Sequence, residues 1–157
     1  MAVVDLTELP QLVGPRAPLV GLDLGEKTIG VAVSDVSRTV ASPLELIRKT
    51  KFGDDAARLF QLMESRGAEG IVIGLPLNMD GSEGPRVQSA RAFARNLLRL
   101  KDVPIAFWDE RMSTMAVNRM LISEADTTRA RRADLVDKMA AAYILQGALE
   151  RLRAAQA

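Results

Sequence analysis

The stretch PLVGLDLGEKTIGVAVSD, residues 18–35, decides the fold of this chain. It holds two short apolar runs, residues 18–23 and 29–33, joined by a turn that contains glycine. Two such runs with a short turn between them predict a β-hairpin. A third apolar run, residues 41–47, follows a polar turn, so the sequence predicts a three-stranded antiparallel meander.

Beyond the meander, the apolar residues change to the spacing of a helix. Residues 56–63 carry this spacing, and Gly67 is a plausible stop. Residues 71–74 form the continuous apolar run typical of a buried parallel strand. The remaining pattern predicts a helix over 85–100, a strand over 104–109, a short helix over 113–122, a basic loop over 123–132 and a long helix over 134–153.

This order predicts an α/β fold, in which a mixed five-stranded sheet of one antiparallel meander and parallel strands is flanked by helices. The length of 157 residues fits one domain. Prolines at 10, 15 and 18 indicate an irregular N-terminal arm over residues 1–17. We therefore expect a single domain over 18–157.

Two residue types are missing: the chain has no cysteine and no histidine. Their absence excludes disulfides, thiol nucleophiles, zinc sites built on these residues and histidine general bases. A metal-dependent reaction would use oxygen ligands, which favour Mg²⁺ or Mn²⁺. The N-terminus lacks the pattern of a signal peptide, and no apolar run approaches the roughly 18 residues of a membrane span. We therefore expect a cytoplasmic protein that does not contact a membrane.

Acidic residues fall at the ends of the expected elements. Asp23 ends the first strand, Asp109 and Glu110 end the last strand, and Asp137 lies in the first turn of the long helix. Ligands of such sheets gather beyond the carboxyl ends of the parallel strands, and a carboxylate in apolar surroundings needs a positive partner such as a metal ion. Converging carboxylates suit two-metal phosphodiester hydrolysis, in which one ion lowers the pKa of a bound water and the other stabilises the leaving oxygen.

Each of these acids also has a purely structural interpretation. Asp23 can open a turn, and Asp137 can stabilise the helix through its dipole. Asp109 and Glu110 can form a solvated strand end beside Arg111. Alternation along the last strand puts these two neighbours on opposite faces, so only one of them faces the site, and alternation alone does not say which.

Basic residues indicate where a phosphate chain would bind. Residues 1–84 carry eight basic and twelve acidic side chains, whereas residues 85–157 carry thirteen and eight. This asymmetry suggests that one face handles phosphate. Lys27 and Arg111 lie beside the candidate acids, and such contacts give salt-sensitive affinity that is independent of sequence. Three arginines crowd the expected loop before the long helix: Arg129, Arg131 and Arg132.

Four longer blocks stand in order along the chain: GLDLGEKTIGVAVSD (21–35), IVIGLPLNMDGSEGP (71–85), DERMST (109–114) and DKMAAAYILQ (137–146). Together they resemble the YqgF family, also called RuvX-like, and with their connections they span roughly residues 18–152. The resemblance implies an RNase H-like fold related to the RuvC junction resolvases.

The resemblance also implies the site residues. The catalytic, metal-binding acids would be Asp23, Glu110 and Asp137, which favours Glu110 over its neighbour, and they would hold two Mg²⁺ or Mn²⁺ ions. Asn78, in the characteristic loop over 75–84, would lie near the substrate. Apart from the resemblance, the positions of the basic residues lead us to expect phosphate contacts from Lys27, Arg111 and the three arginines of the basic segment.

A bacterial cytoplasmic nuclease is the activity that this resemblance implies. We expect a divalent-metal-dependent endonuclease that matures the 5′ end of pre-16S rRNA, with nucleic acid and ribosomal particles as partners. The alternative is a Holliday junction resolvase, whose two symmetric cuts would require a homodimer. Two further hypotheses are a nucleotide-binding protein and a ribosome-assembly factor without catalysis.

Overall fold

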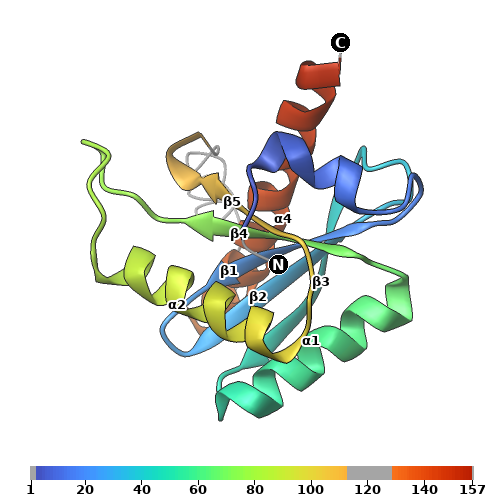
Figure 1. Ribbon diagram of the computed structural model, residues 1–157. Coiled ribbons are helices and arrows are strands. Elements are labelled where there is room, and N and C mark those ends of the chain that lie inside the picture. The colour runs from blue at the N-terminus through green and yellow to red at the C-terminus, as the bar shows by residue number, and fades with distance from the viewer. Residues whose placement is uncertain (1–2, 113–128, 157) are drawn as a thin grey trace.

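The computed structural model describes residues 3–112 and 129–156, and in the second segment it describes side chains from residue 139 onward. One sheet contains all five strands: β1 (Leu19–Leu24), β2 (Thr28–Ser34), β3 (Ala41–Arg48), β4 (Gly70–Leu75) and β5 (Ile105–Asp109). The strand order is β3-β2-β1-β4-β5, with β3, β2 and β1 antiparallel and β1, β4 and β5 parallel (Figure 1). The mixed five-stranded sheet expected from the sequence is confirmed.

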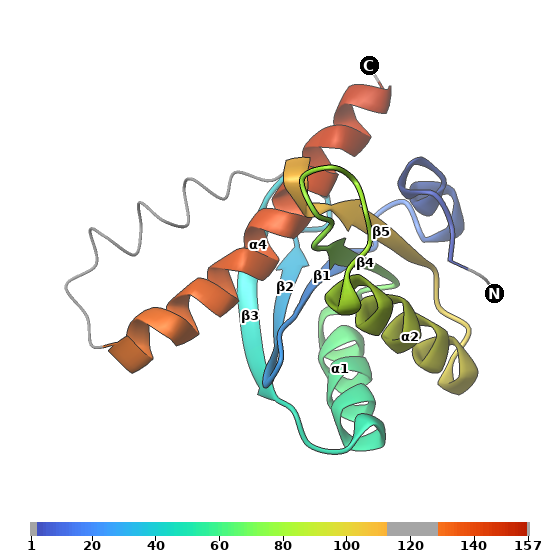
Figure 2. The ribbon, with the colours of Figure 1, turned by 90° about the vertical axis from the view of Figure 1, so that its left-hand side faces the viewer.

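Helices cover both faces of this sheet. The helices α1 (Phe52–Arg66) and α2 (Pro85–Leu100) lie on one face, and α4 (Arg129–Gln156) crosses the other (Figure 2). The chain leaves α1 through Gly67, whose φ of 68° is the left-handed conformation that glycine tolerates best. Within residues 3–112 and 129–156, no helix has the length and apolar character needed to cross a membrane.

The sheet separates two hydrophobic cores whose residues follow the alternation of the strands. Leu22 and Ile73 belong to the core beneath α1 and α2, whereas Leu19, Val72 and Trp108 belong to the core beneath α4. Alternation therefore fixes, strand by strand, which side chains face α4.

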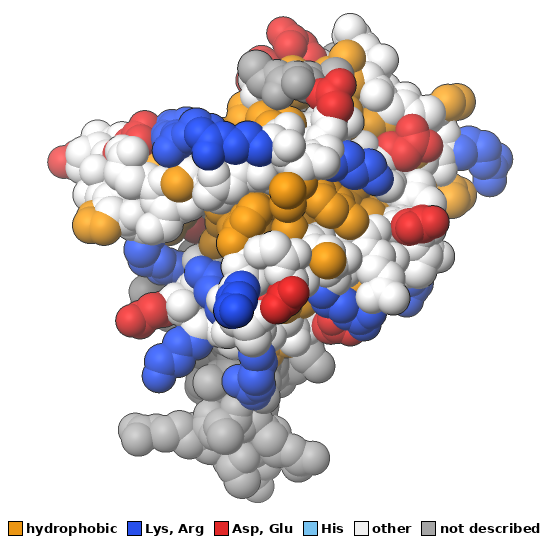
Figure 3. Space-filling view, turned by 60° about the horizontal axis from the view of Figure 1, so that its bottom comes forward, with side chains coloured by type: hydrophobic (Ala, Val, Ile, Leu, Met, Phe, Trp, Pro, Cys, Tyr) orange, Lys and Arg blue, Asp and Glu red, His pale blue; other side chains and the backbone are white. Residues whose placement is uncertain are grey.

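Apolar side chains also reach the surface. Seen from below the view of Figure 1, they form a strip across the surface, with Lys and Arg around it (Figure 3).

The long helix starts earlier than the sequence pattern indicates. It spans Arg129–Gln156, whereas the pattern predicts 134–153, so the three arginines of the expected basic loop lie in the helix. Arginine and alanine favour helices, but this charged segment lacks the apolar spacing from which a helix start is recognised. The helix expected over 113–122 lies outside the described residues.

The N-terminal residues are more ordered than the irregular arm expected for 1–17. A 3-10 helix, η1, spans Leu6–Leu12, and the Asp5 carboxylate accepts a hydrogen bond from the Leu6 backbone N–H. Leu6 and Leu9 are buried in the core beneath α4. Their spacing of three residues matches the three residues per turn of a 3-10 helix, a signal that the prolines mask.

Candidate functional site

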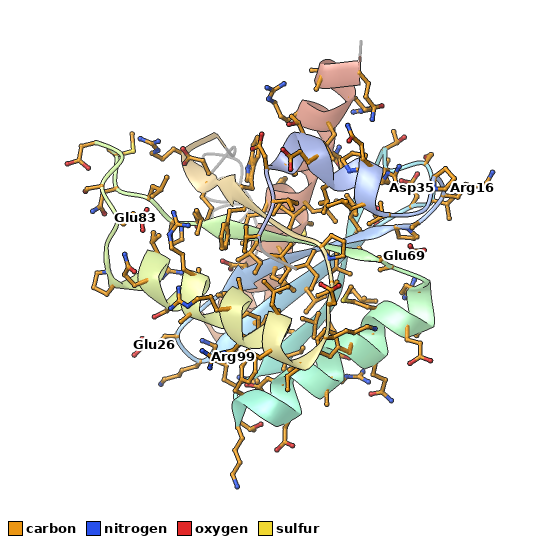
Figure 4. The ribbon with its side chains drawn as sticks, in the orientation of Figure 1. Arg16, Glu26, Asp35, Glu69, Glu83 and Arg99 are labelled. Carbon is orange, nitrogen blue, oxygen red and sulfur yellow. The ribbon has the colours of Figure 1, made fainter. Side chains whose placement is uncertain are left out.

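The carboxyl ends of β1, β4 and β5 meet at one end of the sheet, because these strands are parallel. Asp23 lies near the end of β1, Glu110 follows β5 as the first residue of the short 3-10 helix η2 (Glu110–Met112), and Gly74 lies in β4 between them. Figure 4 labels two side chains on this side of the molecule, Glu26 in the β1–β2 turn and Glu83 in the loop before α2. The sheet thus brings together acids that are far apart in the sequence.

Asp23 and Glu110 share the face of the sheet that α4 covers. Asp23 has the parity of Leu19, which packs beneath α4. A β-carbon added to Gly74 would stand 3.1 Å from Glu110 Cγ and 2.6 Å from Ile144 Cδ1 of α4. The side chain of Glu110 therefore lies over β4, beside α4, and the absence of a side chain at Gly74 leaves room for it.

The electrostatics of this pair favour a bound cation. Partial burial raises the pKa of Glu110 to about 7, and the negative charge of Asp23 adds to the rise. The positive charge of Arg86 opposes it. Two carboxylates that repel one another in a partly buried place offer hard oxygen ligands of the kind that Mg²⁺ and Mn²⁺ accept.

A complete metal cluster is not formed by the described side chains alone. Among them, no group of three or more acidic, histidine or cysteine side chains could hold a metal ion. Asp137 lies in α4, one turn before Ala141, and its side chain is outside the described residues. The same holds for three predicted phosphate contacts, which the structure places on α4 by their backbone alone: Arg129, Arg131 and Arg132.

Close packing fixes the position of α4 on the sheet. A β-carbon added to Gly21 of β1 would stand 2.6 Å from Leu145 Cβ and 3.1 Å from the carbonyl oxygen of Ala141. Only glycine allows the helix to come this close to β1. The helix that carries Asp137 therefore lies directly against the strand that carries Asp23.

Asp109, the neighbour of Glu110, belongs to a different interaction. The Arg111 guanidinium donates to the Asp109 carboxylate at 2.7 Å, and this hydrogen bond lowers the pKa of Asp109. Arg111 Nη1 also donates to the carbonyl oxygen of Met79 at 3.3 Å. Arg111, which the sequence suggests as a phosphate contact, thus ties the end of β5 to the loop over 76–84.

That loop is closed by hydrogen bonds around Asn78. Its backbone N–H donates to the Ser82 carbonyl, its carbonyl accepts from Gly81, and its side-chain Nδ2 donates to Ser82 Oγ at 2.9 Å. Gly81 adopts a φ of 88°, which other residues rarely tolerate. Asn78 therefore shapes the loop, and the exposed tip carries Met79, which is 87% exposed.

Lys27 and Arg86 are two exposed basic residues near the carboxyl end of β1. Lys27 lies in the β1–β2 turn, as expected. Arg86, in the first turn of α2, was not singled out by the sequence analysis, yet its Nη2 donates to the Leu24 carbonyl at 3.4 Å and its charge lowers the pKa of Glu110. The available signal was its place directly after the block that ends at Pro85.

Comparison with known families gives this arrangement a context. The family model described as "RuvX: Holliday junction resolvase" matches residues 17–151, which is most of the chain. This chain belongs to the RuvX family. The resemblance of the four sequence blocks is thereby confirmed, and the match includes both residues of the acid pair.

RuvX relatives match the chain over nearly its full length. A protein of Phenylobacterium zucineum is 79% identical over 154 residues, covering 98% of this chain and 99% of its own, and is named "Putative pre-16S rRNA nuclease". A protein of Caulobacter sp. strain K31 carries the same name and is 68% identical, covering 98% of this chain and 94% of its own.

Solved structures show the same fold at low sequence identity. RuvC of T. thermophilus, in complex with a Holliday junction substrate, aligns with a TM-score of 0.55 at 18% identity, over 87% of this chain and 96% of RuvC. The yeast mitochondrial Holliday junction resolvase Ydc2 aligns with a TM-score of 0.50 at 13% identity, over 95% and 86%. The RuvX chain thus has the RNase H-like fold that its sequence blocks imply.

Proposed function

We propose that this RuvX protein is a divalent-metal-dependent endonuclease that hydrolyses phosphodiester bonds in structured nucleic acid. The observation that carries the proposal is the pair formed by Asp23 and Glu110, in which burial and the charge of Asp23 raise the pKa of Glu110 to about 7. Two ionised carboxylates at such a place destabilise the folded protein, and a bound cation would offset their repulsion. The nuclease names of the relatives support the same chemistry.

Asp23, Glu110 and Asp137 would hold the Mg²⁺ or Mn²⁺ ions. When bound, such ions lower the pKa of a water molecule and stabilise the leaving oxygen of the phosphodiester. Asp23 supplies a carboxylate from β1 and Glu110 supplies one from the residue after β5, and the missing side chain at Gly74 leaves room for Glu110. Arg86 offsets part of the negative charge and offers a guanidinium to a phosphate oxygen.

The preferred substrate is the 5′ precursor segment of 16S rRNA, processed in the cytoplasm on or near ribosomal particles. The support for this choice is that relatives at 79% and 68% identity, over nearly the full length of the chain, carry that name. The second candidate is a four-way DNA junction, which the description of the family and the RuvC complex favour. A resolvase would act as a homodimer, because it makes two symmetric cuts.

The decisive experiment offers both substrates to the same protein. Wild-type protein and Glu110→Gln are incubated with Mg²⁺ or Mn²⁺, a pre-16S 5′ leader RNA and a mobile four-way DNA junction. Cleavage of the RNA alone, lost in Glu110→Gln, supports rRNA maturation. Paired symmetric cuts in the junction alone support the resolvase. Cleavage that survives Glu110→Gln contradicts the assignment of the site.

Metal binding can be tested without any cleavage. We expect millimolar Mg²⁺ to raise the melting temperature of the wild type by about 2–4 °C, which corresponds to roughly 1 kcal/mol in a protein of this size. Glu110→Gln should lose this rise, whereas Glu64→Gln, a change at an exposed position of α1, should keep it. An equal rise in all three proteins would show that Mg²⁺ binds elsewhere.

A further inference from the structure

A pocket of about 800 Å³ opens at the same end of the sheet as the acid pair. It lies between the β1–β2 turn, the end of β3 and the first half of α2. A pocket of this volume is in the range of sites that bind small ligands. The lining includes two apolar and four basic side chains: Leu24, Phe93, Lys27, Arg48, Lys49 and Arg86.

The lining has an apolar wall and a basic rim. Leu24 and Phe93 are partly buried and pack against the core, and the Phe93 ring stands edge-on to Phe52 at 5.4 Å between centroids. The basic side chains of the lining are exposed, so they surround the mouth. Glu26 is the acidic residue in this lining. The pocket therefore matches a ligand that has one flat apolar part and one negative part.

The pocket is next to the acid pair in the structure. Asp23 and Leu24 are consecutive in β1, so Asp23 faces α4 while Leu24 faces the pocket. Arg86 links the two places, because it lines the pocket, donates to the Leu24 carbonyl and acts electrostatically on Glu110. A chain of phosphates that passes around the end of β1 would contact both.

We propose that this pocket holds an unpaired nucleotide of the substrate strand beside the bond that is cut. The inference rests on the proposed nuclease function. Lys27, Lys49 and Arg86 contact the phosphate, and the base lies against Leu24 and Phe93, as bases lie on aromatic side chains in proteins that bind single strands. A base that remains paired cannot enter the pocket, so the protein prefers substrates with an unpaired segment next to the cut.

The test compares two exposed lysines of one segment, of which only the first lines the pocket: Lys49 and Lys51. Binding is measured by fluorescence anisotropy in a Glu110→Gln background, with a labelled RNA duplex that is either blunt or carries a single-stranded overhang. We expect the overhang to bind about tenfold more tightly, as one stacked base provides. Lys49→Ala should reduce this preference severalfold and lower the salt dependence by about 0.7 in the logarithmic slope, whereas Lys51→Ala should leave both unchanged.

Three results would overturn the proposal. The first is equal binding of blunt and overhang duplexes, and the second is an equal effect of Lys49→Ala and Lys51→Ala. The third is a titration with adenosine monophosphate in which Lys49→Ala abolishes nucleotide binding but leaves overhang binding intact, because the pocket would then serve a free nucleotide. The readout needs no cleavage, so a difference between the lysines would persist even if the wild type cut neither substrate.

Discussion

Glu110 is a carboxyl group held where losing its proton is unfavourable. Its ordinary pKa of 4.5 is raised to about 7, first by burial and then by Asp23. Between pH 4.5 and pH 7 the folded state therefore keeps a proton that the unfolded chain loses. The folded state becomes less stable as pH rises through this window, and the loss is complete above pH 7.

Replacing Glu110 by Gln should thus stabilise the metal-free protein at pH 8. We expect a gain of roughly 2 kcal/mol in the free energy of unfolding, which vanishes near pH 4.5. Urea unfolding at both pH values, in the presence of a chelator, measures it. Glu83→Gln is the control, because Arg91 lowers the pKa of Glu83 and the substitution removes a favourable charge. If Glu110→Gln is no more stable than the wild type at pH 8, the pKa of Glu110 is not raised in the folded protein.

Gly74 allows a second prediction. Gly74→Ala would place a β-carbon 2.6 Å from Ile144 Cδ1 and 3.1 Å from Glu110 Cγ, so α4 or the acid must move. We expect a loss of about 1–3 kcal/mol in stability and a strong loss of cleavage. Gly53→Ala, in α1 with no atom within 4 Å of the new carbon, should instead stabilise the protein by about 0.5–1 kcal/mol. Equal effects of the two substitutions on unfolding would contradict this account of Gly74.

In the candidate site, the sequence indicated which kinds of residue lie at the strand ends, but not toward which face of the sheet their side chains point. Asp23 and Glu110 were recognisable as acids at strand ends, but the choice between Asp109 and Glu110 came from a family resemblance. Alternation could not decide it, because it does not reveal which face α4 covers. Arg86 escaped notice because its role depends on a carbonyl oxygen in β1 and a carboxyl after β5, both distant in the sequence.

Among the elements, the loop over 76–84 is held near its tip by Arg111, whereas its end is held on α2 by the ion pair of Glu83 with Arg91 at 2.8 Å. Arg111 joins the Asp109 carboxylate to the Met79 carbonyl, and both groups are at least partly exposed. An exposed ion pair contributes little to global stability, typically less than about 1 kcal/mol. Its effect is local, because it holds the loop that stands beside the acid pair.

Arg111→Ala should therefore release the loop without unfolding the protein. We expect a protease that cuts before aspartate to cut the Met79–Asp80 bond several times faster than in the wild type, while the melting temperature shifts by no more than about 4 °C. Arg58→Ala removes a comparable exposed ion pair, with Glu45, far from the loop, and should leave this cut unchanged. Unchanged proteolysis in Arg111→Ala would show that hydrogen bonds within the loop suffice to hold it.

The strands and α2 were predictable as elements because their apolar spacing reports burial directly. The sequence indicates a helix over 85–100, and α2 spans Pro85–Leu100. The start of α4 was not predictable from spacing, because residues 129–133 are charged or small and show no apolar periodicity in the sequence. The 3-10 helix at Leu6–Leu12 was not predictable from the sequence, because Pro10 indicates an irregular segment and the burial of Leu6 and Leu9 depends on the fold.

In the whole molecule, one end of the sheet carries a different feature on each of its two faces. The acid pair faces α4, and the basic pocket opens toward α2, with β1 between them. Lys49 and Arg86 come from distant parts of the sequence, so no local pattern could have indicated that they line one pocket. The charge asymmetry between the two halves of the sequence suggested phosphate binding. Only the fold shows where basic side chains gather.

The N-terminal arm determines whether one border of the sheet remains available to other molecules. β5 is the last strand of the sheet, and Val4 donates its backbone N–H to the Ile105 carbonyl at 2.9 Å, which covers part of that strand. An uncovered edge strand recruits strands from other chains and promotes aggregation.

Deleting residues 1–5 should therefore increase light scattering on mild heating, at a temperature where the full chain stays clear. Deleting residues 155–157 is the matched control at the opposite terminus and should leave the solution clear. A clear solution of the N-terminal deletion would show that η1 alone shields β5. If the solution turns turbid as expected, the few residues before η1 protect the protein from aggregation. The yield of soluble protein in the cell would then measure how much the cell gains from them.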